Sequence, residues 1–205
     1  MNTNKFSRAA IPRPFGAANW VTGTRAIFAA GLLGYVLLAL AQDLPPTPPL
    51  RWFWAAGALA ALALDGIDGM LARRLGAASR FGARFDLETD AATLLGLSLL
   101  VWSSGQAGPW VLASGAMRYI FVAASWAWPA LAAPLPASKR RQAICATQIV
   151  VLILAAVPPI PPPVAAALCF VALALLSYSF AADVAWLVVR RVGEGNEDDR
   201  KEAAI

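Results

Sequence analysis

The chain has 205 residues, of which 59% are hydrophobic and only 14% are charged, and its formal net charge at pH 7 is +5. Soluble domains are closer to half apolar and a quarter charged, so this composition excludes an ordinary soluble domain and favours a membrane protein of one domain. The chain contains no histidine, which excludes Ser-His-Asp and Cys-His catalysis and leaves oxygen ligands for any bound metal ion.

The apolar residues form long blocks, which points to membrane spans, each of which needs about 20 mostly apolar residues. We therefore predict an all-α, polytopic membrane protein with six transmembrane helices, at residues 18–41, 52–73, 83–104, 109–132, 141–157 and 163–189. These helices belong to one membrane domain over residues 1–192. The charged segment that follows, residues 193–205, is predicted to be a disordered tail.

Basic residues are concentrated in the N-terminal segment, in the second and fourth connections, and after the last span. The opposite connections, 42–51, 105–108 and 158–162, hold a single basic residue, Arg51. By the positive-inside rule both termini are predicted to be cytoplasmic, which agrees with an even number of spans. Because the positive charge is divided among four segments, we interpret it as a topology signal and a match to anionic membrane lipids, and expect no nucleic-acid partner.

Polar residues open the first predicted span, in the segment NWVTGTR. Asn19 stands where a helix N-cap is expected, and Thr22 and Arg25 follow at intervals of three residues. From these residues alone we expect a capped helix whose arginine extends its charged end to the membrane surface.

Four aspartates lie where the second and third spans approach their shared connection. The apolar run 52–64 has 13 residues, which is too short to cross a bilayer, so the second helix must continue through Asp65 and Asp68. The third helix must for the same reason include Asp86 and Asp90. Residues three or four apart share a helix face, so each helix presents its two carboxylates on one side.

The two pairs of carboxylates are predicted to converge at the cytoplasmic boundary of the membrane. Four carboxylates close together repel one another or take up protons, and a divalent cation relieves this repulsion and can organise phosphoryl chemistry. Acids within membrane spans usually face a cavity and carry function. Glu88 lies on the other side of the third helix and is interpreted as an interfacial acid.

Small residues lie on the same sides of the two helices as the aspartates. Gly69 and Ala72 follow the first pair, and Gly82 precedes Asp86 by four residues. Without larger side chains at these positions a flat ligand can approach the backbone closely. Arg73 comes directly after them, within reach of phosphate oxygens.

The spacing of these residues resembles the complete signature of the CDP-alcohol phosphotransferase family. Eight positions within 26 residues match it: Asp65, Asp68, Gly69, Ala72, Arg73, Gly82, Asp86 and Asp90. The predicted six spans, the cytoplasmic termini and the place of the signature between the second and third spans also agree with that family.

The resemblance implies a role for each residue of the signature. Asp65, Asp68 and Asp86 would hold one or two Mg²⁺ or Mn²⁺ ions, with Asp90 as a shared ligand or as the general base. The three small residues would line the cytidine, and Arg73 would meet the diphosphate. The acceptor hydroxyl would attack the β-phosphorus of the donor and CMP would leave.

The polar start of the first span is also similar to the family's Asn-x-x-Thr-x-x-Arg motif, which would place Asn19, Thr22 and Arg25 near the donor phosphates. Arg118 is the only charged residue between Pro109 and Pro136. An arginine so placed needs an anion, and we expect either the acceptor's phosphate or Asp183 of the last span.

Lys139 and Arg141 begin the fifth predicted span. Their positive charge contributes to the topology signal, and relatives place basic residues here to bind an acceptor phosphate. We therefore predict an acceptor site that includes Lys139, Arg141 and Arg118.

The donor class expected under this resemblance is CDP-diacylglycerol, and the predicted product is a phospholipid or its precursor. An anionic acceptor such as glycerol 3-phosphate suits the basic cluster, yet relatives that use it usually carry Asp-Pro-x-x-Asp-Lys where this chain has Asp86-Leu-Glu-Thr-Asp90-Ala91. The acceptor therefore stays open, as does a CDP-choline-like donor with a lipid acceptor. A homodimer in the cell (inner) membrane is expected by analogy.

Two other function classes use intramembrane acids. A membrane prenyltransferase needs two separated Asp-rich motifs and more spans. A cation or proton carrier usually holds its acids near the middle of the bilayer, in broken helices or repeats. Here the acids lie at one edge and no repeat is present, so both classes fit less well than the phosphotransferase.

Overall fold

The computed structural model describes residues 17–75, 80–128 and 138–202, and it describes side chains over 22–66, at 82, and over 84–128 and 138–188. The described residues form helices joined by short turns, with no strand among them, so the predicted all-α class is confirmed. The elements are α1 Ala17–Ala41, α2 Pro48–Leu75, α3 Arg80–Ser103, the 3-10 turn η1 Pro109–Val111, α4 Leu112–Ala127, α5 Lys139–Ala156 and α6 Pro162–Glu202.

Each predicted span overlaps one α-helix, and the fourth also includes η1, but several ends differ. Helix α2 begins at Pro48 rather than at residue 52, because proline is well tolerated in the first turn, where its missing N–H leaves no helical bond unmade. Helix α4 ends at Ala127, and the rest of the predicted fourth span, 129–132, lies outside the described residues.

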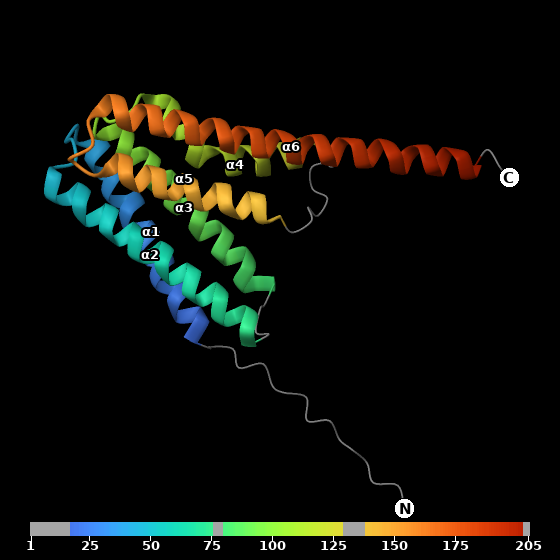
Figure 1. Cartoon of the computed structure of the whole chain (residues 1–205), viewed down its shortest axis with the longest axis horizontal. Coiled ribbons are helices and arrows are strands. Elements are labelled where there is room, and N and C mark those ends of the chain that lie inside the picture. Colours follow the sequence, from blue (N-terminus) through green and yellow to red (C-terminus); the bar gives the residue numbers. More distant parts are fainter. Residues whose placement is uncertain (1–16, 76–79, 129–137, 203–205) are drawn as a thin grey trace, which may run out of the picture.

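Helix α6 continues to Glu202, through residues for which the sequence predicts a disordered tail. Residues 193–202 contain three glutamates, one arginine and one lysine beside two glycines, and Glu197 and Lys201 stand four residues apart, a spacing that supports a helix. Its 41 residues correspond to a length of about 60 Å. In Figure 1 the C-terminal part of α6 extends well past the other helices.

Two segments are long and apolar enough to cross a membrane by length and composition, Thr22–Ala41 in α1 and Pro162–Val188 in α6. The signature-bearing parts of α2 and α3 combine apolar turns with charged ones. The structure therefore supports six helices, of which two have the composition of a membrane span within the described part of the chain.

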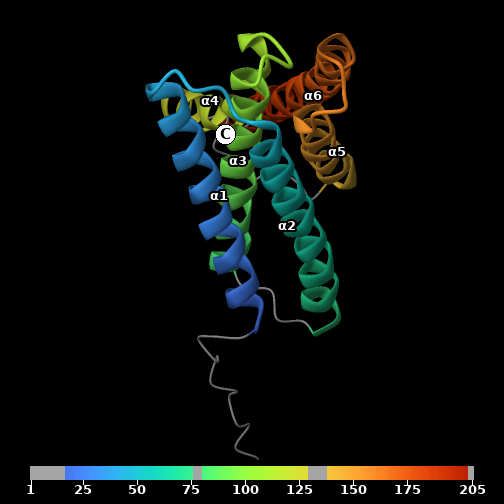
Figure 2. The same cartoon turned by 90° about the vertical axis from the view of Figure 1, so that its left-hand side faces the viewer.

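The helices that surround the signature form a ring. Helix α1 packs on α2 and α3, and α5 packs on the same two helices from the other side, whereas the described residues of α2 and α3 make little direct contact with each other. Figure 2 shows α1 beside α3, with α2 set apart from both towards their lower ends. The two acid-bearing helices are therefore held diagonally across the ring.

Helices α4 and α6 complete the bundle outside this ring. Helix α4 packs on α3, and α6 packs mainly on α5. The connections α1–α2, α3–α4 and α5–α6 gather at one end of the molecule (Figure 1), and the connections that the sequence predicts there hold a single basic residue, Arg51.

The apolar core lies towards the end of the ring that carries these connections. It is built from fully buried aliphatic side chains of α1, α3 and α5, including Leu32, Leu97 and Leu152. Alanines of α2, among them Ala55 and Ala58, are buried against them. Between helices in a membrane, close packing of such side chains stabilises their association, so this end fixes the helix positions and leaves the other end to carry polar groups.

Candidate active site

Three of the four predicted aspartates converge in the structure. Asp65 comes from α2, and Asp86 and Asp90 come from successive turns of α3. Their side chains are 34%, 38% and 23% exposed, respectively, so Asp90 is the most enclosed of the three. The predicted convergence is thus present for these three carboxylates, across a space between two helices that make little contact.

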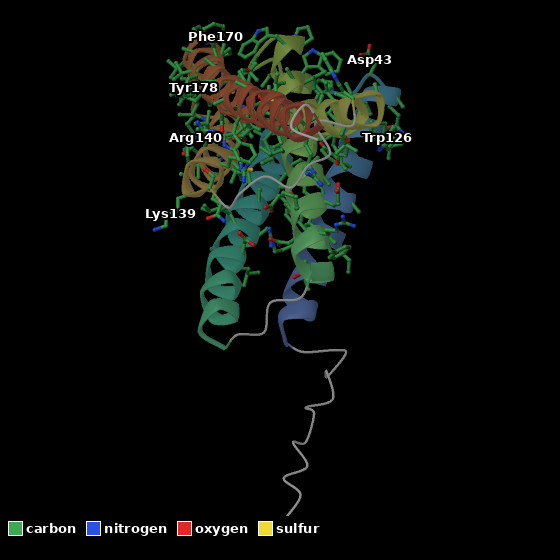
Figure 3. All side chains as sticks on the ribbon, turned by 90° about the vertical axis from the view of Figure 1, so that its right-hand side faces the viewer. Asp43, Trp126, Lys139, Arg140, Phe170 and Tyr178 are labelled. Carbon is green, nitrogen blue, oxygen red and sulfur yellow. The ribbon has the colours of Figure 1, made fainter. Side chains whose placement is uncertain are left out.

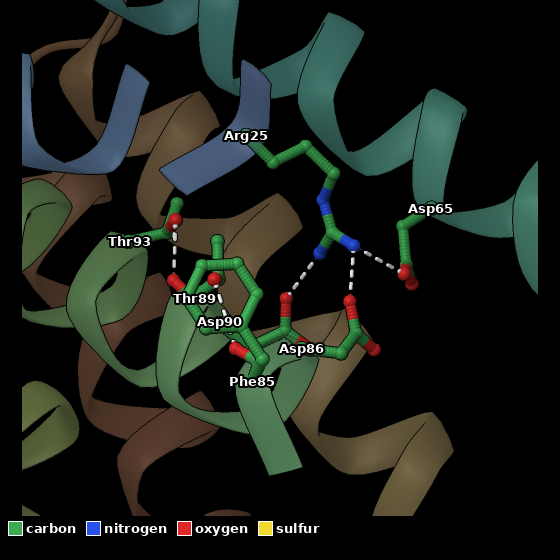
Figure 4. Close-up of polar contacts among 7 residues, drawn as sticks. All are labelled: Arg25, Asp65, Phe85, Asp86, Thr89, Asp90 and Thr93. Atoms are coloured by element: carbon green, nitrogen blue, oxygen red, sulfur yellow. Dashed lines mark hydrogen bonds and ion pairs between the residues drawn. The ribbon is translucent and has the colours of Figure 1, made fainter. Parts of the chain in front are cut away.

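The group on which they converge is the guanidinium of Arg25, from α1. Its Nη1 atom donates to Asp65 Oδ1 at 2.6 Å and also to Asp86 Oδ1, and its Nη2 atom donates to Asp90 Oδ1 at 2.5 Å. Figure 4 shows the guanidinium lying between the three carboxylates. The Arg25 side chain is only 6% exposed, so the expectation that it extends to the membrane surface is wrong.

Charge explains this arrangement. A buried guanidinium is costly unless carboxylates surround it, and carboxylates in one place repel unless a cation lies among them. Three carboxylates against one guanidinium leave two negative charges uncompensated among these four side chains. The cluster therefore retains an attraction for further positive charge.

The neighbouring threonines of α3 do not compete for its two aspartates. Thr89 and Thr93, one turn apart, are buried. Their hydroxyls donate to the carbonyl oxygens of Phe85 and Thr89, respectively. Because both threonine hydroxyls donate to carbonyl oxygens of their own helix (Figure 4), they do not donate to the carboxylates. Asp86 and Asp90 remain directed across the ring.

The donor set suits a hard divalent cation. Carboxylate oxygens are the ligands that Mg²⁺ and Mn²⁺ prefer, and here they come from two helices to within hydrogen-bond reach of one positive group. As they stand around the guanidinium, no three acidic or sulfur side chains of the described part are close enough to one another to form a metal site. The carboxylates suit such an ion chemically, and in this structure the Arg25 guanidinium lies between the predicted ligands of the ion.

Several predicted site residues lie outside the described side chains. The structure describes the backbone of these residues but not their side chains. They are Asn19 in the first turn of α1, and Asp68, Gly69, Ala72 and Arg73 in α2. Since α1 already begins at Ala17, the interpretation of Asn19 as the helix N-cap does not hold.

Two further predicted nucleotide-binding residues are described. Thr22 lies one turn before Arg25 on α1, and Gly82 lies one turn before Asp86 on α3; both are half-buried. Residues one turn apart share a helix face. Both positions therefore border the carboxylate cluster on the side towards the helix ends.

Arg118 of α4 forms an ion pair with Glu88 of α3. Its Nε atom is buried and has no hydrogen-bond partner among the described residues. Cys145 of α5 lies near enough to Asp65, Asp90 and Arg118 to interact with them electrostatically, so Arg118 lies in the same part of the bundle as the carboxylate cluster. Glu88 stays outside the cluster, as its position on the helix predicts.

Asp183 of α6 pairs with the start of α5 rather than with Arg118. Its Oδ1 atom accepts from Arg140 at 2.9 Å, and its Oδ2 atom lies 3.5 Å from Arg141 Nη1. The alternative pairing of Arg118 with Asp183 is thus wrong. Lys139 is exposed, and Figure 3 shows it pointing away from the bundle.

Sequence reasoning missed Arg25 as the partner of the carboxylates. Its place two turns into an apolar helix, with no carboxylate near it in the sequence, indicates that Arg25 needs an anion from another helix but does not say which one. It also missed Arg140 as a partner of Asp183, since nothing local in the sequence relates α5 to α6.

A family model described as CDP-alcohol phosphatidyltransferase matches residues 15–188 of the chain, a range that contains the whole carboxylate cluster and five complete helices. No curated protein and no solved structure is significantly similar to it. The chain therefore belongs to the CDP-alcohol phosphatidyltransferase family, membrane-associated transferases of phospholipid biosynthesis that move a substituted phosphate group.

Proposed function

We propose that the protein transfers a phosphatidyl group from CDP-diacylglycerol to the hydroxyl of a small polar acceptor and releases CMP. The observation that carries the proposal is the convergence of Asp65, Asp86 and Asp90 from two helices on one positive group. A nucleotide-linked diphosphate needs such a concentration of metal ligands beside it, because its own negative charge otherwise opposes binding to carboxylates.

Asp65, Asp68 and Asp86 are proposed as ligands of Mg²⁺ or Mn²⁺, with Asp90 as a further shared ligand. When bound, the cation would offset the negative charge of the diphosphate and of the departing CMP. The number of ions, one or two, depends on how Asp68 joins the three described carboxylates.

Asp90 is also proposed as the general base. It is the most enclosed of the three described carboxylates, and a carboxylate oxygen within hydrogen-bond reach can take the proton of the acceptor hydroxyl. The acceptor oxygen then forms a bond to the β-phosphorus, the bond from that phosphorus to the bridging oxygen breaks, and CMP leaves with the bridging oxygen. Asp90 holds the proton.

The nucleotide is proposed to lie along the helix ends next to the cluster. Thr22, Gly82, Asn19, Gly69 and Ala72 would line it. The signature arginine, Arg73, would contact the diphosphate, because a guanidinium can donate two parallel hydrogen bonds to phosphate oxygens.

The acceptor is proposed to enter between the cluster and α4. Cys145 lies near both Arg118 and the carboxylates, and Arg118 has a buried donor atom without a hydrogen-bond partner among the described residues. Lys139 and Arg141, at the start of α5, would add positive charge on the approach. These basic groups favour an acceptor that carries a phosphate or another anion.

Six spans with both termini in the cytoplasm and the active site at the cytoplasmic face of the cell membrane form part of the same proposal. It is supported by the distribution of basic residues and by the gathering of the three basic-poor connections at one end of the bundle. A homodimer is carried over from the family as a prediction.

An acceptor screen tests the proposed reaction. Purified protein in detergent is given radiolabelled CDP-diacylglycerol, Mg²⁺ and, one at a time, glycerol 3-phosphate, serine, inositol phosphate or another polyol, and CMP release is measured. We expect CMP release that depends on one acceptor and on the metal. Release only with CDP-choline and diacylglycerol would instead place the lipid on the acceptor. No release with any pair would contradict the proposal.

A further inference from the structure

Arg25 is the most enclosed charged side chain among the four that form the carboxylate cluster. Its guanidinium contacts one carboxylate from α2 and two from α3 through two different nitrogens. It thereby bridges helices that make little direct contact with each other. The cluster depends on a positive group that comes from a third helix.

The Oδ1 atoms that accept from Arg25 belong to the carboxylates proposed to bind the metal. A divalent cation that collects these carboxylates needs the space between them and the same negative charge. The guanidinium takes up both. Arg25 and the metal are therefore competitors for one place.

We propose that Arg25 is an internal counter-cation, which holds the carboxylates together when no divalent cation is bound and gives way when one binds. The inference rests on the proposed metal-dependent function. Its physical basis is that three carboxylates around one point repel strongly in a partly buried site unless positive charge lies among them. A tethered guanidinium supplies that charge without closing the site permanently.

The choice of arginine fits this role. Its planar group donates in several fixed directions, so one side chain can contact carboxylates on two helices, whereas a lysine ammonium is a compact point charge. The long flexible stem of arginine allows the group to leave by rotation about its side-chain bonds, with α1 itself staying in place.

Mn²⁺ binding to the full-length protein in detergent, without any donor, provides the test. Free Mn²⁺ is measured by electron paramagnetic resonance for the wild type and for Arg25→Gln and Arg25→Lys. Arg51→Gln serves as the matched control, because Arg51 is also a buried arginine but donates to the Ala156 carbonyl oxygen at the other end of the bundle.

Removal of the competing charge is expected to tighten Mn²⁺ binding by about tenfold in Arg25→Gln. Arg25→Lys should lie between that variant and the wild type, and Arg51→Gln should bind as the wild type does. In EDTA the Arg25→Gln variant should melt at a lower temperature than the wild type, and Mn²⁺ should raise its melting temperature by more than it raises that of the wild type.

Equal or weaker Mn²⁺ binding in Arg25→Gln would overturn the inference. If Arg25 only held the ligands in position, its removal would lower the affinity of the protein for Mn²⁺. If Arg25→Gln does not fold, the lysine variant decides: affinity no tighter than that of the wild type overturns the inference. A wild type that binds no Mn²⁺ overturns both this inference and the proposed metal site. If the wild type binds Mn²⁺ and Arg25→Gln binds it with the same affinity, the inference is overturned but the proposed metal site is not.

Discussion

At the scale of single residues, a substitution at Asp90 tests the chemical step, as distinct from donor binding. Asp90→Asn keeps the size of the side chain but removes a carboxylate that can accept a proton. We expect the rate of CMP release to fall by about 10²–10⁴-fold, the usual contribution of a positioned acid or base. Binding of CDP with Mg²⁺, measured by calorimetry, should weaken by a much smaller factor than CMP release, because Asp90 is proposed as only one of several metal ligands. Unchanged activity would discard Asp90 as the base.

Arg118 is the residue whose removal should affect the acceptor alone. Cys145 interacts electrostatically with both Arg118 and the carboxylates, and the buried Nε atom of Arg118 has no hydrogen-bond partner among the described residues. Arg118→Gln is predicted to raise the KM for an anionic acceptor by about tenfold or more, as expected for loss of a charge-assisted hydrogen bond. Steady-state kinetics with each substrate varied in turn measures this. A raised KM for the donor, with the acceptor KM unchanged, would contradict the assignment.

The sequence predicted the carboxylates better than their partners. Asp65, Asp86 and Asp90 were expected together because short apolar runs forced them into helices and their spacing put them on single faces. Arg25 was not expected among them, since local spacing says nothing about which helix lies across the ring. The pairs of Arg118 with Glu88 and of Asp183 with Arg140 depend in the same way on the packing of distant helices.

At the scale of elements, the contact between α3 and α4 depends on Gly115. A Cβ atom at this position would lie 2.4 Å from the Leu95 Cα atom and 2.7 Å from its backbone nitrogen. The neighbour is backbone and cannot rotate away, so the helices would have to separate. Ser114, next in the chain, accepts a hydrogen bond from the buried Gln148 of α5 at 2.9 Å, and that bond depends on the same close packing.

Gly115→Ala is therefore predicted to destabilise the protein by about 1–3 kcal/mol, the usual cost of overpacking. Gly34→Ala in α1 is the control, because nothing lies within 4 Å of a Cβ placed there, and it should be neutral or stabilising by up to about 1 kcal/mol. Thermal unfolding in detergent measures both. Equal melting temperatures for the two variants would show that α3 and α4 do not pack this closely.

The lengths of the apolar blocks predict which segments form helices, but they do not predict where several of these helices begin or end. The start of α2 at Pro48 depends on proline being accepted in a first turn. The continuation of α6 through residues 193–202 depends on weak helix propensity and charge spacing, which composition alone assigns to disorder.

At the scale of the whole molecule, the orientation in the membrane makes a separate prediction. Asp43 is exposed in the α1–α2 connection and Lys139 is exposed at the start of α5, and Figure 3 shows them well separated on the molecule. In a background with Cys145 and Cys169 replaced by serine, a membrane-impermeant maleimide should label Asp43→Cys in intact cells. Lys139→Cys should be labelled only after permeabilisation. The reverse pattern would invert the topology and move the carboxylates to the outer face.

The measurement that tests the central claim most directly is CDP binding by titration calorimetry with Mg²⁺ and with EDTA, for the wild type and Asp86→Asn. If the pooled carboxylates hold a cation that in turn holds the diphosphate, the wild type should bind CDP in Mg²⁺ and at least about tenfold more weakly in EDTA. Asp86→Asn should lose most of this difference. Equal CDP affinity with and without Mg²⁺, or an Asp86→Asn variant that behaves as the wild type, would contradict the account.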